Sequence, residues 1–233
     1  MRVQRPEARK GSRGLVFPSL IVSCQARADN PLHGPHFMAA MALAVEQGGA
    51  RGIRANGTED IQAIRAITYL PIIGINKRWV EGYEVYITPD FEAAKEVAEA
   101  GADVIALDAT ARPRPKESLA ELIHLIHAEL GKTVLADVST LEEGLYAAQL
   151  GADFIATTLS GYTPYSPKTE GPDFDLIQQL VAGVGVPVIA EGRFWTLEEV
   201  SKAFDLGASA VVVGTAITNP REITRRLVQG VPV

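Results

Sequence analysis

The sequence predicts an α/β protein built as a closed (β/α)8 barrel, and two observations support this class. Short apolar segments, typical of buried parallel strands, alternate with segments of helical periodicity at intervals of roughly 20 to 35 residues. Eight such units in a chain of 233 residues fit one barrel most economically. A doubly wound open sheet is the rival prediction, but no Gly-x-Gly-x-x-Gly turn follows the first strand.

Strands and helices are predicted in regular alternation along the chain. The predicted strands span residues 20–25, 52–56, 71–77, 103–110, 132–139, 153–160, 187–193 and 210–215. The predicted helices span residues 35–47, 58–68, 89–100, 117–130, 140–150, 173–182, 196–206 and 220–228.

Local signals support several of these helix boundaries. The second helix begins at Thr58, whose hydroxyl can cap its N-terminus. The fifth and seventh begin at Thr140 and Thr196, and each threonine precedes a pair of glutamates that suits the positive end of the helix dipole. Glycines that supply a left-handed helix end follow the third, fifth and seventh helices, at Gly101, Gly151 and Gly207.

Residues 14–233 are expected to form a single catalytic domain, because no linker or change of composition divides them. The basic tail at residues 1–13 has no hydrophobic segment, so we expect a flexible tail or an extra helix rather than a secretion signal. Cys24 is the only cysteine, which rules out an intrachain disulfide and fits a cytoplasmic protein.

The charge balance limits the possible partners. The chain has 22 basic and 28 acidic residues and a net charge of −6, which argues against a nucleic-acid or anionic-membrane surface. No apolar run approaches the ~20 residues that a membrane-spanning helix needs. We therefore expect a small-molecule substrate.

Polar residues at the carboxyl ends of the predicted strands indicate an active site. Residues two apart in a strand share a face, and in (β/α)8 barrels the last inward residues meet over the packed core. The first seven strands each end with such residues on one face: Ser23 and Gln25, Arg54 and Asn56, Lys77, Asp108 and Thr110, Asp137 and Ser139, Thr158 and Ser160, and Glu191 and Arg193.

Lys77 is the most informative of these residues, because it follows the apolar run 72–75. Burying an ammonium group without a partner costs free energy, and desolvation lowers the pKa of an amine. A lysine in such a position can act as a base or a nucleophile near neutral pH. Alternatively, Lys77 only marks the point where the strand reaches solvent.

Glycines in the last two strand–helix loops predict a phosphate site. Gly192 follows the seventh strand, and Gly214 and Thr215 end the eighth. Exposed backbone N–H groups beside a helix start bind phosphate in such barrels. The alternative for Gly214 is a packing glycine at a tight turn.

Other candidates have weaker support. His124 and His127 could form a metal pair, but a helix of the outer ring is the wrong place for it. His33 and His36 could line the site or lie on the surface. The loop at residues 161–166 could be a lid that excludes water or a rigid turn.

Several motifs resemble the N-acetylmannosamine-6-phosphate 2-epimerase family. They include Ile21-Val-Ser-Cys-Gln25, Pro71-Ile-Ile-Gly-Ile-Asn-Lys-Arg78, Ala136-Asp-Val-Ser-Thr140 and Ala190-Glu-Gly-Arg193. The resemblance runs from about Leu20 to the C-terminus and leaves out the basic tail.

The resemblance implies a phosphate-binding barrel that interconverts N-acetylmannosamine 6-phosphate and N-acetylglucosamine 6-phosphate in sialic acid breakdown. It implies no metal or redox cofactor. By motif, Lys77 and Glu191 are the expected catalytic pair. The expected substrate-binding residues are Gln25, Arg54, Asp137, Thr158 and Arg193, and the expected phosphate ligands are backbone groups of Gly192, Gly214 and Thr215. A homodimer is also expected, because such barrels often pair through outer helices.

The chemistry of C2 epimerisation agrees with the strand-end residues. A desolvated lysine and a carboxylate can remove the proton α to the aldehyde and return one to the opposite face. Which of Lys77 and Glu191 takes the proton stays open, as do a single lysine acting on both faces and a relay through the substrate amide. Two rival functions are a Schiff-base aldolase with Lys77 as nucleophile and a phosphosugar-binding protein without catalysis.

Overall fold

Eight parallel strands close into one barrel, which confirms the predicted fold class. The computed structural model describes residues 14–232. The tail at residues 1–13, for which a flexible segment or an extra helix was predicted, lies outside them. The strands are β1 Ser19–Cys24, β2 Gly52–Asn56, β3 Ile72–Ile75, β4 Val104–Asp108, β5 Thr133–Asp137, β6 Phe154–Ala156, β7 Val188–Glu191 and β8 Ala210–Val213. Each strand pairs with the next, and β8 pairs with β1, so the open-sheet alternative is wrong.

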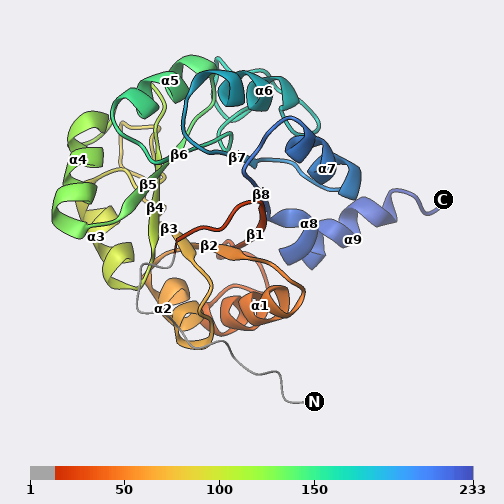
Figure 1. Cartoon of the computed structure of the whole chain (residues 1–233). Helices are drawn as coiled ribbons and strands as arrows, with labels where there is room; N and C mark the ends of the chain where they lie inside the picture. Colours follow the sequence, from red (N-terminus) through yellow and green to blue (C-terminus); the bar gives the residue numbers. More distant parts are fainter. Residues whose placement is uncertain (1–13, 233) are drawn as a thin grey trace.

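Helices surround the barrel, as Figure 1 shows in a view along it. They are α1 Pro35–Gln47, α2 Thr58–Ile67, α3 Phe91–Glu99, α4 Leu119–Leu130, α5 Leu141–Gln149, α6 Phe174–Gly183, α7 Leu197–Asp205, α8 Thr215–Thr218 and α9 Pro220–Val228. The short α8 was not predicted from sequence. No helix in residues 14–232 has both the length and the apolar composition needed to cross a bilayer.

The predicted caps at Thr140 and Thr196 are confirmed, whereas the predicted cap at Thr58 is wrong, because Gly57 is the N-cap of α2 and no side chain caps that helix. Thr140 accepts a hydrogen bond from the backbone N–H of Glu143, whose side chain accepts one from the Thr140 backbone. Thr196 and Glu199 form the same reciprocal pair at the start of α7. Gly101 follows α3 with a φ of 110°, a conformation that costs glycine little and other residues more.

Two apolar layers hold the barrel and its helices together. Inward side chains fill the barrel, including Ile21, Ile73, Leu135, Ile189 and Val212. Outward side chains of the strands, such as Ile53, Ile72 and Val134, pack against helix side chains such as Leu122 and Leu180. Each fully buried side chain of this size stabilises the fold by about 1.5–3 kcal/mol relative to exposure. The inner layer forms a floor beneath the polar residues at the carboxyl ends of the strands.

Most strands end earlier than their polar sequence pattern suggested. The parallel ladder of β3 ends at Ile75, and Lys77 instead pairs with Ile87 through an isolated antiparallel bridge. This bridge belongs to the β3–α3 connection, in which Tyr86 accepts a hydrogen bond from the backbone of Arg78. Lys77 therefore lies on a hairpin above the barrel rather than at the end of a strand.

Candidate active site

Lys77 is fixed by two neighbouring strands of the barrel. Its backbone N–H donates to Asn56 Oδ1 at 2.9 Å, and its Nζ donates to Gln25 Oε1 at 2.8 Å. Gln25 in turn donates from Nε2 to Ser23 Oγ at 2.8 Å. The side chains that follow β1 and β3 thus meet at the mouth of the barrel, as predicted for Gln25 and Lys77.

Burial lowers the pKa of Lys77 from 10.5 to about 8. The positive charge of Arg54 lowers it further, while Glu191 acts in the opposite direction. An amine with this pKa is partly neutral near physiological pH, so it can accept a proton and can also donate one. The environment of Lys77 therefore suits an acid–base role.

Arg54 crosses from β2 to the far side of the barrel. Its Nη1 and Nη2 donate to the two carboxylate oxygens of Asp137 at 2.9 and 2.5 Å, a bidentate pair. Nη1 also lies 2.6 Å from Glu191 Oε2. Burial alone would lower the pKa of Arg54, but the carboxylates of Asp137 and Glu191 raise it above its usual value. The guanidinium is thus a fixed positive charge beneath the mouth.

Glu191 completes this network at the end of β7. Burial raises the pKa of its carboxyl group, which Arg54 opposes and the nearby Asp137 reinforces. The Thr158 hydroxyl lies 3.2 Å from Glu191 Oε2 and 2.6 Å from Asp137 Oδ1. Arg54, Asp137, Thr158 and Glu191 therefore form one connected group, which brings together four of the predicted site residues.

The pH dependence of catalysis should follow the Lys77–Glu191 pair as a unit. An acid–base pair that acts on two faces of a carbon needs one proton shared between its members, whichever residue takes the substrate proton. As pH rises through about 8, Lys77 loses its proton and the pair holds none. We therefore expect kcat/KM to fall above about pH 8. A profile of kcat/KM that is flat or rises from pH 7 to 10 would contradict this assignment.

The predicted phosphate residues lie together at the ends of β7 and β8. Gly192 has a φ of 119°, so any other residue there would be strained. Gly214 approaches Ser23 so closely that a Cβ would lie 3.3 Å from Ser23 Cβ. Gly214 is also the N-cap of α8, and Thr215 is the first residue of that helix. Backbone N–H groups are thus available on this side of the mouth.

Arg193 points away from Lys77 and Glu191. Its guanidinium donates to the backbone oxygens of Ser160 and Gly171 at 2.7 and 2.8 Å and to Thr169 Oγ1 at 2.9 Å. It also lies over the ring of Tyr162, 5.6 Å from the centroid. These contacts bind Arg193 to the β6–α6 loop, so its predicted role in holding the sugar stays a proposal.

Hydrogen bonds also tie the β6–α6 loop to the barrel. Ser166 Oγ accepts from the Gly161 N–H at 2.9 Å and from the Thr163 hydroxyl at 2.7 Å. The Thr163 hydroxyl also lies 3.0 Å from Ser139 Oγ. Such internal bonding is typical of a rigid turn, which was one of the two alternatives for residues 161–166.

Several polar residues on the predicted face serve the loops instead. Ser139 donates its hydroxyl to Glu143 at 2.8 Å, and Ser160 donates to Asp173 at 2.5 Å. They lie beyond the ends of β5 and β6, where the alternation of faces no longer holds. Tyr86 and Arg112, which lie near the mouth, were not among the residues predicted for the site.

The weaker candidates are not drawn into the site. His127 pairs with Asp153 at 2.8 Å, and His33 Nδ1 lies 3.1 Å from the Ala26 oxygen. No group of three or more potential metal-ligating side chains occurs within residues 14–232. Burial raises the pKa of Cys24 to about 12, so its thiol is not activated as a nucleophile.

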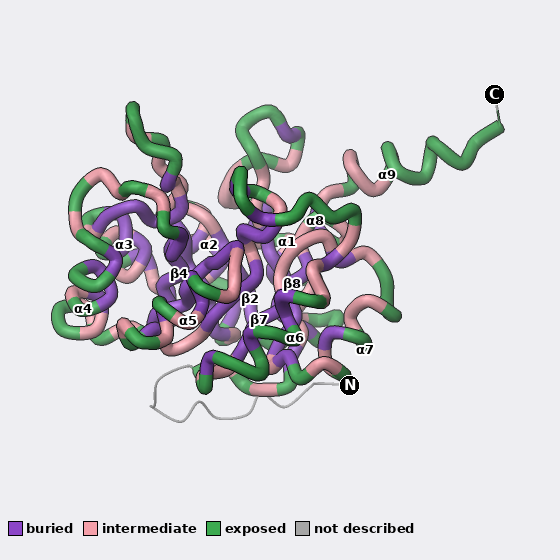
Figure 2. Tube along the Cα trace, turned by 90° about the horizontal axis from the view of Figure 1, so that it is seen from above, coloured by how far each residue is buried: buried purple, intermediate pink, exposed green. Residues whose placement is uncertain are grey.

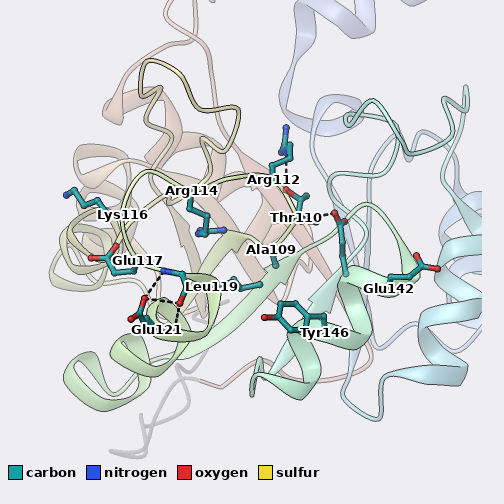
Figure 3. Close-up of a pocket in the computed structure, with 13 residues that line it drawn as sticks. Ala109, Thr110, Arg112, Arg114, Lys116, Glu117, Leu119, Glu121, Glu142 and Tyr146 are labelled. Carbon is teal, nitrogen blue, oxygen red and sulfur yellow. Dashed lines mark hydrogen bonds between the residues drawn. The ribbon is translucent and has the colours of Figure 1, made fainter.

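A pocket of about 710 Å³ lies beside the barrel rather than at these residues. Figure 3 shows its lining, which includes Arg114, Leu119, Glu142 and Tyr146 from the loop after β4 and the starts of α4 and α5. None of the predicted catalytic, sugar-binding or phosphate-binding residues lines it. The chemistry therefore points to the mouth of the barrel and not to this pocket.

The fold and the site define a (β/α)8-barrel enzyme with acid–base groups at the carboxyl ends of its strands. A family model described as "Putative N-acetylmannosamine-6-phosphate epimerase" matches residues 38–232. The chain belongs to this family, which confirms the resemblance seen in its motifs.

Individual relatives agree with the family assignment. A Caldanaerobacter subterraneus subsp. tengcongensis protein named "Putative N-acetylmannosamine-6-phosphate 2-epimerase" is 56% identical over 211 residues, which cover 90% of this chain and 89% of that protein. A Clostridium perfringens (strain SM101) protein of the same name is 52% identical over 213 residues, 91% of this chain and 96% of that one. The solved structure of N-acetylmannosamine-6-phosphate 2-epimerase from Clostridium perfringens has a TM-score of 0.92 and 47% identity, and the match covers 98% of this chain and 100% of that one.

Proposed function

We propose that the protein interconverts N-acetylmannosamine 6-phosphate and N-acetylglucosamine 6-phosphate in amino-sugar breakdown. The observation that carries the proposal is the Lys77 amine at the mouth of the barrel, whose pKa is lowered to about 8 and which interacts with the Glu191 carboxylate. Family membership and the 47% identical Clostridium perfringens epimerase support the choice of substrate.

The reaction needs acid–base chemistry at one carbon. In the opened sugar, C2 lies next to the aldehyde, so its proton is acidic enough for a positioned base to remove. Lys77 and Glu191 are the proposed acid–base pair, and return of a proton to the opposite face inverts C2. This chemistry uses protein side chains alone, so the proposal includes no cofactor.

The enediolate intermediate needs a hydrogen-bond donor for its developing oxyanion. Both terminal nitrogens of Arg54 already bond to carboxylates. Gln25 uses one N–H of its amide to bond Ser23, which leaves the other N–H for a ligand. We therefore favour Gln25 as the direct donor, with Arg54 fixing the positions of Asp137 and Glu191.

The phosphate group would bind at the ends of β7 and β8. Backbone N–H groups at Gly192, Gly214 and Thr215 are the proposed ligands, since such groups at a loop and a helix start favour anions. This places the C6 end of the sugar beside β7 and β8, and C2 toward Lys77.

Proton NMR in D₂O tests the proposed function directly. We expect the purified protein to convert N-acetylmannosamine 6-phosphate into N-acetylglucosamine 6-phosphate that carries deuterium at C2. If the substrate keeps its C2 proton and its configuration, the proposal fails and the binding-protein alternative gains support.

A Schiff-base aldolase remains the second candidate, because a lysine with a lowered pKa is also a good nucleophile. Borohydride treatment with substrate separates the two functions. The epimerase mechanism predicts no trapped adduct on Lys77, whereas the aldolase mechanism predicts one.

A homodimer is the proposed assembly. The helix α9 extends away from the barrel in Figure 2 and has no buried residue. Its apolar residues Leu227 and Val228 are 71% and 59% exposed, which favours burial against a second copy.

We also propose a cytoplasmic setting, which the single free cysteine supports.

Replacing both Leu227 and Val228 with aspartate is expected to convert a dimer into a monomer. Two charges on the apolar face of α9 would have to be buried in the interface, which costs several kcal/mol per unpaired charge. Light scattering after size-exclusion chromatography measures the mass, with Gln229→Asp as the matched control. A monomeric wild-type protein, or an unchanged dimer in the double variant, would contradict the proposed role of α9.

A further inference from the structure

Arg112 lies at the mouth of the barrel with a donor group unused by the protein. Its Nη2 bonds to Asp108 Oδ2 at 2.6 Å, and its Nε bonds to Thr110 Oγ1 at 2.9 Å. Nη1 has no hydrogen-bond partner among residues 14–232, and it is not one of the buried unpaired atoms. Two bonds therefore fix the guanidinium plane and leave one edge open to a ligand.

The anchor of Arg112 is part of the barrel itself. Asp108 is fully buried at the end of β4 and is paired in register with Asp137 of β5. Two neighbouring strands thus end in aspartates, and each aspartate bonds to an arginine, Asp137 to Arg54 and Asp108 to Arg112. Arg54 uses both terminal nitrogens within the protein, whereas Arg112 does not.

Arg112 lies at the edge of the pocket beside the barrel and is one of its lining residues. In Figure 3 its guanidinium points away from Leu119 and Tyr146, which line the pocket, while Arg114 extends across the pocket. Both arginines bond to Asp108, Arg112 to its carboxylate and Arg114 to its backbone oxygen.

Tyr86 forms an aromatic wall on the same side of the mouth. Its ring stacks on Trp79 with centroids 5.5 Å apart and planes 5° apart, and it packs against the apolar floor of the barrel. Burial raises the pKa of Tyr86, the carboxylates of Asp137 and Asp108 raise it further, and Arg112 opposes them. The next residue, Ile87, accepts a hydrogen bond from the Asp108 N–H at 2.9 Å, so Tyr86 lies close to the end of β4.

The order of strands in the barrel fixes which part of a ligand reaches this side. β4 lies across the closed barrel from β8, where the phosphate would bind. Lys77 follows β3, and β4 is the next strand of the barrel, so a substituent on C2 of a sugar held with C2 at Lys77 can reach the side chains beyond β4. That substituent is an amide, with a carbonyl oxygen that accepts a hydrogen bond and an apolar methyl group.

We propose that Arg112 and Tyr86 form the subsite for the N-acyl group of the substrate. The free Nη1 of Arg112 donates to the amide oxygen, and the ring of Tyr86 packs against the methyl group. The inference rests on the proposed function, because it takes the substrate and the phosphate position from it.

Tyr86→Ala tests the aromatic wall through the acyl preference. We expect the ratio of kcat/KM for N-propanoyl- to N-acetylmannosamine 6-phosphate to rise about tenfold, because one methylene in an apolar pocket is worth about 10–200-fold. Tyr86→Phe keeps the ring and should leave this ratio near that of the wild type. An unchanged ratio in Tyr86→Ala would contradict the proposed packing of the Tyr86 ring against the methyl group.

Arg112→Lys tests the hydrogen bond to the amide oxygen while keeping a positive charge beside Asp108. We expect kcat/KM for N-acetylmannosamine 6-phosphate to fall about tenfold or more, since bonds to charged groups are the stronger ones. Mannosamine 6-phosphate lacks the carbonyl oxygen, so its inhibition constant should change by less than about twofold. Arg51→Lys, a control at an exposed arginine directly before β2, should change neither quantity.

If Arg112→Lys weakened the binding of N-acetylmannosamine 6-phosphate and of mannosamine 6-phosphate equally, Arg112 would have a structural role and the proposed subsite would be wrong. Turnover by the wild type in the same assay reports separately on the proposed function. Calorimetric titration with N-acetylmannosamine 6-phosphate, its N-propanoyl analogue and mannosamine 6-phosphate gives the same comparison from dissociation constants alone. A protein without turnover that still shows the Arg112 and Tyr86 effects would therefore keep the subsite and lose the epimerase function.

Discussion

Replacing Lys77 with methionine is expected to lower kcat for epimerisation by about 10²-fold or more, the usual contribution of a general acid–base group. Methionine keeps most of the volume of the side chain and removes the proton-transferring amine. In D₂O, the variant should lose the C2 exchange that depends on Lys77, which NMR measures for each epimer separately.

The fold of Lys77→Met should survive. The pKa of Lys77 is lower in the folded protein than its usual value, so its folded form binds fewer protons between pH 8 and 10.5. Stability therefore rises with pH through this window, and below pH 8 the charged amine opposes folding. Removing it should leave the thermal midpoint at neutral pH at least as high as in the wild type.

Lys95→Met is the control for this experiment, because Lys95 lies on α3 and its side chain is 47% exposed. Its activity should stay near that of the wild type. Turnover of Lys77→Met within about a factor of two of the wild type would remove Lys77 from the mechanism, since general acid–base groups contribute far more.

Replacing Glu191 with glutamine is expected to lower epimerisation by a similar factor, about 10²-fold or more. In the wild-type protein, Arg54 Nη1 lies 2.6 Å from the Glu191 carboxylate. A glutamine side chain can still accept a hydrogen bond from Arg54, but it cannot take up or release a proton in catalysis. The change therefore removes the proton-transferring group and one negative charge beside Arg54, while it keeps the shape of the side chain and an acceptor for the Arg54 hydrogen bond.

The exchange pattern of Glu191→Gln distinguishes the mechanisms. If Lys77 and Glu191 act on opposite faces, only one of the two epimers should exchange its C2 proton in the variant, and neither should be converted. In Lys77→Met, the other epimer should exchange. Exchange of both epimers in Glu191→Gln would favour a single lysine acting on both faces, and full conversion would exclude Glu191 from the mechanism.

The fold could be predicted because each strand–helix unit carries its own signal. Apolar runs identified the strands, and capping residues such as Thr140 and Thr196 identified helix starts. The helix α8 could not be predicted, because its four residues, Thr215–Thr218, do not complete two turns and show no periodicity. It forms because the chain turns directly from β8 into α9.

The centre of the site could be predicted because charged residues are rare in buried strands. Arg54, Asp137 and Glu191 interrupt apolar segments, and the structure joins all three through hydrogen bonds. The outer residues could not be predicted in the same way. Ser139 and Ser160 continue the pattern of alternation, but they lie past the ends of their strands and bond to loops.

Tertiary packing also decides what an arginine contacts. Arg193 lies two residues after Glu191 and was predicted to share its face of the strand. Its guanidinium nevertheless bonds to the backbone of the β6–α6 loop. Arg112 reads in sequence as a surface residue four positions from Asp108, although its side chain is only 9% exposed. Neither contact follows from spacing along the chain, because each depends on how two loops meet.

The arginine that crosses the barrel has a consequence for how this protein could be divided or recombined. Arg54 lies on β2, whereas Asp137 and Glu191 lie on β5 and β7. A chain cut between β4 and β5 would leave the cation in one fragment and both anions in the other. Each half would carry unmatched charge, so a half-barrel taken from another protein could replace one of them only if it supplied the complementary groups.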